Sequence, residues 1–96
     1  MSLPAAERVE AIRRAIEVAL APVALAVQDD SHRHVGHAGA RDGRGHFSVD
    51  VVSAEFAGLA PLARHRRVYA AVGSLMDTDI HALAIRARTP QEADAG

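Results

Sequence analysis

The sequence predicts an α+β domain in which two helices pack on one face of a mixed three-stranded sheet. Apolar residues recur at helical spacing over residues 3–21 and 61–76. They alternate with polar or small residues over 23–28, 47–52 and 80–88, which is typical of half-buried strands. The resulting order is helix, strand, strand, helix, strand. The first two strands then form an antiparallel hairpin, whereas the helix between the last two makes them parallel.

Length and composition limit the chain to one small globular domain, which we place at residues 1–96. Of its 96 residues, 49% are hydrophobic and 24% are charged, a balance that excludes wholesale disorder. The net charge of −1 excludes a general basic field for duplex DNA, so any nucleic-acid binding requires a local patch. The chain contains no cysteine, which excludes disulfides and thiolate ligands.

The N-terminal helix is predicted by a single apolar stripe. Val9, Ile12 and Ile16 fall on one face of residues 3–21, while charged residues occupy the other face. Pro22 ends the helix because proline cannot continue the hydrogen-bonding pattern. We therefore expect an amphipathic helix that buries one side against the sheet.

A long loop separates the two strands of the hairpin. Residues 29–46 contain four glycines and four histidines and show no apolar periodicity. A hairpin can be closed by two residues, and loops of this length in small domains are usually functional or disordered. Because its glycines favour an open ensemble, we expect this loop to be mobile.

The second half of the chain predicts a helix, a strand and a tail. Pro61 suits a first helical turn, and Leu62, Val68, Tyr69 and Val72 share one face of the helix. His65 lies near the middle of that stripe, where a half-buried structural histidine is the preferred interpretation. Residues 80–88 then form the third strand, and residues 90–96 are expected to be a frayed tail.

Histidines are the most distinctive feature of the composition. His32, His34 and His37 have an H-x-H-x-x-H spacing on the glycine-flanked loop, which allows their imidazoles to converge on one metal ion. From spacing alone, solvated polar loop residues are the preferred interpretation. His81 opens the third strand on the same parity as Leu83, either as the fixed half of a ligand pair or as a hydrogen-bonded histidine at the sheet edge. His46 is expected only to begin the second strand.

Five arginines are candidates for a phosphate-binding patch. These are Arg64, Arg66, Arg67, Arg86 and Arg88. A solvated helix face paired with acidic residues is the preferred interpretation, because the first turn of the second helix lacks the side chains that read base edges. No oxyanion site or nucleophile motif accompanies the histidines and aspartates, so we expect the protein not to be an enzyme.

Three segments together resemble the BolA family. They are DDSHRH after the first strand, the pattern F-x-G-x-x-x-L-x-R-H-R-x-V-Y from Phe56 to Tyr69, and IHALAIRARTP near the end. The resemblance runs from about Val9 to Pro90. It implies a KH-like (type II) α-β-β-α-β fold without the nucleic-acid-binding G-x-x-G loop, in agreement with the element order above.

The resemblance also implies a function. BolA-like proteins pair with monothiol glutaredoxins and share a glutathione-dependent [2Fe–2S] cluster, in iron–sulfur, iron-status and redox regulation. It places the family's cluster-ligating histidine on His81 and the variable loop ligand on His34, with His32 and His37 as alternates because this loop carries extra residues. We expect no cofactor in the isolated protein.

The alternative function is that of a DNA-binding transcriptional regulator of stress response and cell morphology, which the family also includes. It would use the five arginines named above.

The sequence has no run of about 18 apolar residues, and its first residues are too acidic and polar for a secretory signal. We therefore expect a cytoplasmic protein without membrane contact, a monomer or weak dimer on its own.

Overall fold

The computed structural model describes residues 2–31 and 43–95 and confirms the predicted α+β class. The elements are α1 (Ala5–Leu20), β1 (Ala24–Asp29), β2 (Gly45–Val52), the short 3₁₀ turn η3 (Ala54–Phe56), α2 (Pro61–Val72), α3 (Leu75–Thr78), β3 (Ile80–Arg88) and α4 (Pro90–Ala95). None of the helices in this part of the chain is long and apolar enough to cross a membrane. The hairpin strands begin or end within two residues of the expected positions, and β3 has the expected bounds.

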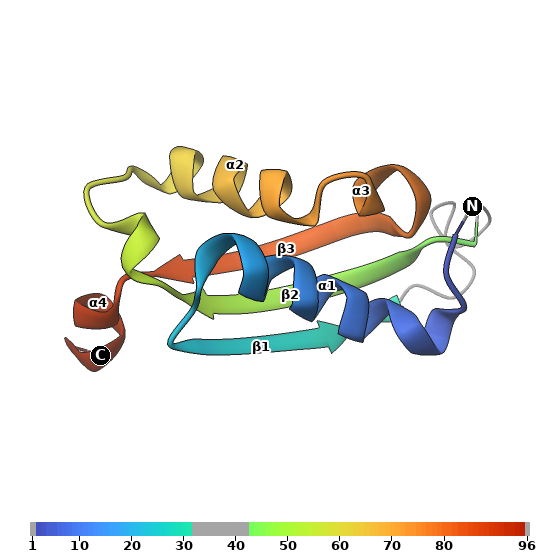
Figure 1. The fold of residues 1–96 in the computed structure, drawn as a ribbon, viewed down its shortest axis with the longest axis horizontal. Coiled ribbons are helices and arrows are strands. Elements are labelled where there is room, and N and C mark those ends of the chain that lie inside the picture. The colour runs from blue at the N-terminus through green and yellow to red at the C-terminus, as the bar shows by residue number, and fades with distance from the viewer. Residues whose placement is uncertain (1, 32–42, 96) are drawn as a thin grey trace.

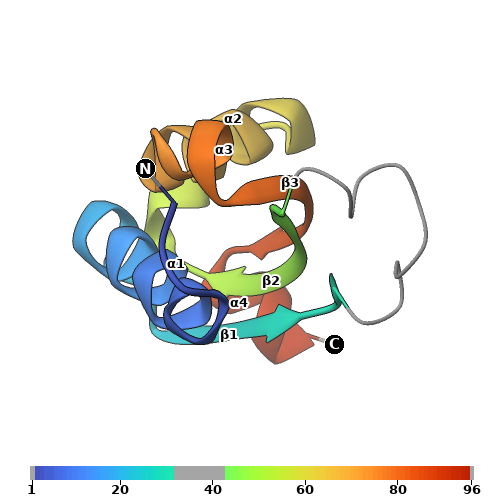
Figure 2. The ribbon, with the colours of Figure 1, turned by 90° about the vertical axis from the view of Figure 1, so that its right-hand side faces the viewer.

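The sheet has the predicted mixed topology, with β2 in the centre. β1 pairs antiparallel with β2, with Leu25 opposite Val51, and β2 pairs parallel with β3, with Phe47 opposite Leu83. Helices α1 and α2 cover one face of the sheet (Figures 1 and 2). The core between these layers consists of Ile12, Ile16, Leu20, Phe47, Val49, Val51, Phe56, Val68, Val72, Ile80 and Leu83.

The second helix differs from the prediction in length and in orientation. It ends at Val72 because Gly73 adopts a positive φ of 54°, and a separate single turn, α3, follows. Leu62 is 63% exposed and Tyr69 is 40% exposed, so the expectation that both lie on the buried face is wrong. Val68 and Val72 alone carry the fully buried contact of α2, and His65 is half-buried as predicted.

The C-terminal tail is a helix in the structure, whereas we expected residues 90–96 to be frayed. Thr89 precedes α4, and its backbone N–H donates to the Glu92 carboxylate at 2.8 Å while the Glu92 N–H donates to Thr89 Oγ1 at 3.2 Å. This reciprocal pair is a capping box, and Pro90 in the first turn adds to it. The local sequence T-P-Q-E therefore carried the signal for this helix.

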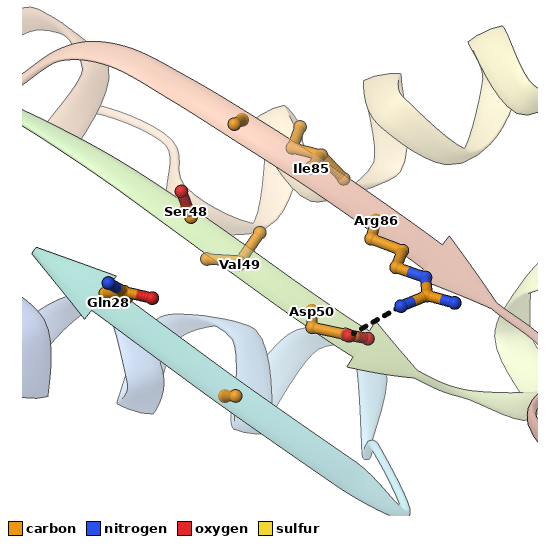
Figure 3. A pocket seen from close by; sticks show the side chains of 8 residues that line it. Gln28, Ser48, Val49, Asp50, Ile85 and Arg86 are labelled. Atoms are coloured by element: carbon orange, nitrogen blue, oxygen red, sulfur yellow. Dashed lines mark ion pairs between the residues drawn. The ribbon is translucent and has the colours of Figure 1, made fainter. Parts of the chain in front are cut away.

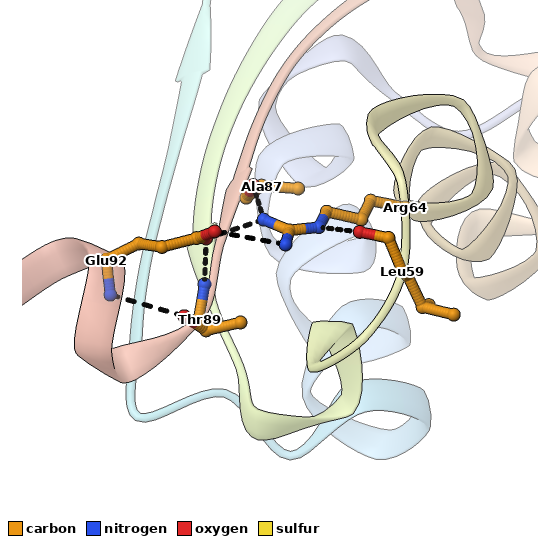
Figure 4. A network of polar contacts seen from close by, with 5 residues as sticks. All are labelled: Leu59, Arg64, Ala87, Thr89 and Glu92. Carbon is orange, nitrogen blue, oxygen red and sulfur yellow. Dashed lines mark hydrogen bonds and ion pairs between the residues drawn. The ribbon is translucent and has the colours of Figure 1, made fainter.

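Arg64 fastens this helix to α2 and β3 (Figure 4). Its guanidinium donates to Glu92 Oε1 at 2.6 Å and to Oε2 at 3.1 Å, a two-pronged ion pair. It also donates to the carbonyl oxygens of Leu59 at 2.8 Å and Ala87 at 3.2 Å. We call Arg64, Thr89 and Glu92 the C-terminal clamp. The hydrogen bonds from Arg64 and from the Thr89 backbone lower the pKa of Glu92 from 4.5 to about 2.

Asp79 joins the opposite end of the fold and is only 1% exposed. Its Oδ1 accepts from the Leu3 N–H at 2.7 Å and from Arg8 Nε at 3.0 Å, and its Oδ2 accepts from Thr78 Oγ1 at 2.6 Å. The Asp79 carbonyl accepts from the Gly45 N–H at 2.9 Å. One residue therefore ties the N-terminus and α1 to the start of both β2 and β3.

Replacing Asp79 by Asn should destabilise the fold by about 3 kcal/mol, because Arg8 would remain buried without its counter-charge. Burial raises the pKa of Asp79, but the hydrogen bonds from Thr78, the Leu3 backbone and Arg8 outweigh it and hold the pKa below 3.8. A lowered pKa contributes stability above the unfolded value that is lost as pH falls through the folded value. Denaturant unfolding between pH 7 and 2 should therefore show an acid-labile contribution below about pH 4 that is absent from Asp79→Asn.

The control for Asp79 is Asp77→Asn, which removes an exposed carboxylate from the same short segment. It should leave both the unfolding free energy and its pH dependence nearly unchanged. Equal stability of the two variants would contradict the role given to Asp79.

Replacing Glu92 by Gln should loosen α4 without unfolding the core. Glutamine keeps the capping geometry but removes the charge that Arg64 binds. Because the pKa of Glu92 falls from 4.5 to about 2, the clamp is complete above about pH 4.5 and is lost as the pH falls toward 2. An NMR titration of the Glu92 carboxyl group should give a pKa of about 2. Amide exchange in α4 should accelerate in Glu92→Gln, while Asp94→Asn, on the same helix, should exchange like the wild type.

Candidate functional site

The candidate site lies at the end of the sheet where β1 ends and where β2 and β3 both begin, on the right in Figure 1. His81 is the second residue of β3 and is exposed. The loop candidates His32, His34 and His37 lie outside the described residues. Of the predicted ligand pair, His81 alone lies within the described residues.

A bulge in the β2–β3 pairing determines where His81 points. Gly45 pairs with Ile80, but His46 pairs with Ala82, so His81 is the extra residue between two paired positions. Ile80 and Leu83 are both buried, while His81 and Ala82 between them are exposed. An unbroken alternation would direct His81 to the side of Leu83, into the core. With the bulge, His81 is exposed instead.

His46 is the neighbour that sequence reasoning missed. Its ring centroid lies 5.2 Å from that of His81, with the ring planes inclined at 42°. In β2, His46 alternates with the core residues and lies on the same side as Ser48 and Asp50. Since β2 and β3 are parallel and both carry a histidine near their start, the sequence offered a signal that the two rings lie side by side. The structure thus brings together two imidazoles from different strands.

Arg44 borders this pair of imidazoles. Its guanidinium donates to His81 Nδ1 at 3.3 Å and to the Met76 carbonyl oxygen at 3.2 Å. Because arginine has no acceptor, Nδ1 must be the accepting nitrogen of the His81 ring in this arrangement. Arg44 therefore orients His81 and places a permanent positive charge beside it.

Polar contacts fix the backbone around His46. The His46 N–H donates to Ser31 Oγ at 3.1 Å, and its carbonyl accepts from the Asp30 N–H at 2.7 Å. Ser48 Oγ donates to the buried carboxylate of Asp30. A Cβ at Gly45 would lie 2.7 Å from both the Phe47 ring and Ser31 Oγ, so a larger residue at this position would displace these side chains. These contacts hold the start of β2 rigid up to the point where the loop begins.

The residues described here can supply two imidazole ligands and no larger set. Within 2–31 and 43–95, no group of three or more His, Cys, Asp or Glu is placed to hold a metal ion. A cluster shared between two proteins needs only part of its ligands from each, and imidazole ligands on one iron are known chemistry for [2Fe–2S] centres. His81 and its surroundings therefore fit a shared cluster.

Four of the five candidate phosphate-binding arginines are paired with carboxylates. Arg64 belongs to the C-terminal clamp, and its side chain is only 14% exposed. Arg67 pairs with Glu55 at 2.8 Å. Arg66 is exposed on α2.

Arg86 and Arg88 share one carboxylate on the outer face of the sheet, away from the helices. Asp50 lies 3.7 Å from Arg86 and 3.1 Å from Arg88. A depression of about 280 Å³ beside them has Ala26, Ser48 and Ala84 among its lining residues (Figure 3). Since one acidic side chain faces two arginines, this edge keeps a modest local positive charge.

Comparison with known proteins identifies the family. Residues 16–92 match the family described as BolA-like protein. The chain is 46% identical over 82 residues to human BolA-like protein 1, covering 85% of this chain and 58% of that protein. It is 39% identical over 83 residues to the Escherichia coli DNA-binding transcriptional regulator BolA, covering 86% and 76%. The chain spans less than two thirds of the human protein and of Arabidopsis thaliana BOLA1, of which it covers 56%.

Solved structures agree with this assignment. The Mus musculus BolA1 solution structure superposes with a TM-score of 0.76 at 38% identity, covering 98% of this chain and 72% of that one. The BolA domain of Arabidopsis thaliana SufE1 superposes with a TM-score of 0.79 at 35% identity, covering 95% and 99%. None of the relatives named here is called an enzyme. By sequence match and by fold, this chain belongs to the BolA-like protein family.

Proposed function

We propose that this protein is a non-catalytic partner of a monothiol glutaredoxin and shares a glutathione-dependent [2Fe–2S] cluster with it. His81 is the ligand from the rigid part of the chain, and a loop histidine, His34 in the first instance, is the expected mobile one. The observation that carries the proposal is the exposed position of His81 at the loop end of the sheet, where a bulge turns it away from the core.

The charge beside His81 suits this assignment. A glutaredoxin thiolate and a glutathione thiolate would bring negative charge to the cluster, together with the two carboxylates of glutathione. The guanidinium of Arg44 lies 3.3 Å from His81 Nδ1 and places a positive charge next to this ligand. Two opposite charges about 4 Å apart attract each other by several kcal/mol in a site that is partly shielded from water. Arg44 thus favours an anionic assembly at His81.

His81→Ala should abolish the shared cluster. We would mix the protein with a monothiol glutaredoxin and glutathione, reconstitute the cluster, and record visible absorption and circular dichroism. The wild type should give a spectrum distinct from that of the glutaredoxin homodimer, because imidazole replaces thiolate on one iron. The His81→Ala mixture should show only the homodimer spectrum.

Loop variants then identify the mobile ligand. Loss of the mixed spectrum in His34→Ala would assign that residue, whereas its retention would direct the assignment to His32 or His37. The amide NMR spectrum of each variant serves as the folding control. A wild-type mixture that shows the glutaredoxin homodimer spectrum alone would refute the cluster proposal.

A second function, DNA-binding regulation, is favoured by one observation, the name of the Escherichia coli relative. The ion pairs of Arg64, Arg67, Arg86 and Arg88 weigh against it, since paired arginines are poor phosphate ligands. We expect no saturable binding to duplex DNA at about 50 mM salt.

A salt titration tests this second function. Saturable binding that weakens steeply with salt, and that falls in Arg66→Gln but not in Arg14→Gln on the neighbouring helix α1, would instead establish the DNA-binding function.

A further inference from the structure

We propose that His46 and His81 together form a two-imidazole site for a single tetrahedral first-row metal ion, such as Zn²⁺ or one iron of a cluster. The inference rests on the proposed function only in that His81 is a metal ligand in both. It adds a second ligand on the rigid sheet, where the proposed function looks to the loop. The carrying observation is the juxtaposition of the two rings across the β2–β3 bulge.

The separation of the rings matches that of two imidazoles on one tetrahedral ion. A bound imidazole nitrogen lies about 2.0–2.1 Å from zinc, and the ring centre lies roughly 1.2 Å beyond it, so two rings at the tetrahedral angle have centres about 5 Å apart. The centroids of His46 and His81 are 5.2 Å apart. The separation of the two rings is therefore the one that a shared tetrahedral ion requires.

Ring packing alone does not explain the arrangement. Aromatic pairs gain most from offset stacking or from edge-to-face contact, which require nearly parallel or nearly perpendicular planes. The planes of His46 and His81 are inclined at 42°, between these two geometries. His81 is also exposed and His46 is only half-buried, so burial of the ring pair stabilises little.

The backbone holds both ligands in place before any ion arrives. His46 is fixed by hydrogen bonds to Ser31 and Asp30, and the neighbouring Gly45 donates to the Asp79 carbonyl at 2.9 Å. Asp79 in turn lies two residues before His81 in the chain. Ligands on rigid strands lose less conformational entropy on binding than ligands on a glycine-rich loop.

Within residues 2–31 and 43–95 no third protein ligand joins the pair, so the remaining coordination positions must be filled by other groups. Water fills them in the isolated protein, and the thiolates of a partner fill them in a complex. Arg44 opposes a bare cation, because its charge repels the ion and its Nη2 occupies His81 Nδ1. The isolated protein should therefore bind Zn²⁺ reversibly, and Arg44→Gln should bind it more tightly.

Zinc titration of the isolated full chain tests the site without glutaredoxin. Calorimetry measures affinity, and nitrogen-15 NMR of the imidazole rings reports which histidines bind. In the wild type the ring nitrogens of His46 and His81 should shift together with one stoichiometric ion. His46→Gln and His81→Gln should each weaken binding by at least tenfold, because even the loss of a hydrogen-bond partner of a metal ligand commonly costs about 10–100-fold in affinity.

Two control variants separate this site from the other histidines. The triple variant His32→Ala, His34→Ala, His37→Ala should keep the wild-type zinc affinity, and so should His65→Gln on α2. Binding that survives His81→Gln but disappears in the triple variant would overturn the proposal in favour of a loop-only site. Saturation with zinc that leaves the His46 ring unshifted in the wild type would overturn it as well, without depending on any variant's folding.

The outcome is independent of the cluster experiment. Zinc-dependent shifts of His46 and His81, with no mixed spectrum alongside glutaredoxin, would uphold the two-imidazole site and refute the proposed function. A mixed spectrum that is lost in His81→Ala and unchanged in His46→Gln, with no zinc shift at His46, would do the reverse.

Discussion

The carboxylate of Asp79 is the interaction on which the site depends. Buried and charged, it is stable only because it accepts hydrogen bonds from Leu3, Arg8 and Thr78. Its own carbonyl then fixes Gly45 at the start of β2. Ile80, the residue after Asp79, is fully buried. The hydrogen bonds of Asp79 and the burial of Ile80 together determine where the chain enters β3. His81 is the second residue after Asp79, and its exposure follows from this anchor and the bulge together.

The fold was predictable because its periodicities are local. The alternation of apolar residues over 80–88 gave the bounds of β3, and the stripe of Ile12 and Ile16 gave the buried face of α1. The helix α4 was predictable too, from the T-P-Q-E capping box, but its apolar content is too low for periodicity to reveal it. The exposure of Leu62 was not predictable, because the helical wheel does not determine how far α2 turns toward the sheet.

The site was only half predictable, for a physical reason. The position of His81 at a strand start follows from sequence, whereas its pairing with His46 depends on a single-residue shift of register between β2 and β3. Arg64 shows the same limit, since the partner that removes it from a phosphate-binding face is Glu92, 28 residues away on another element. Contacts across such distances depend on tertiary packing, which hydrophobic periodicity does not encode.

The proposed site takes one ligand, His81, from the sheet and expects the other from the sequence between β1 and β2, and the two ligands have different physical roles. Ligands on the sheet bind with little entropic cost but offer one fixed geometry, whereas a glycine-rich connection allows many geometries at a higher cost. Arg44 stands beside the fixed half and repels a lone cation while attracting an anionic assembly. Under the proposed function, such a site would hold a bare metal ion weakly and would hold it well only when a partner supplies negative ligands. Partner-dependent retention is therefore the consequence that we expect from an arginine 3.3 Å from the proposed ligand His81.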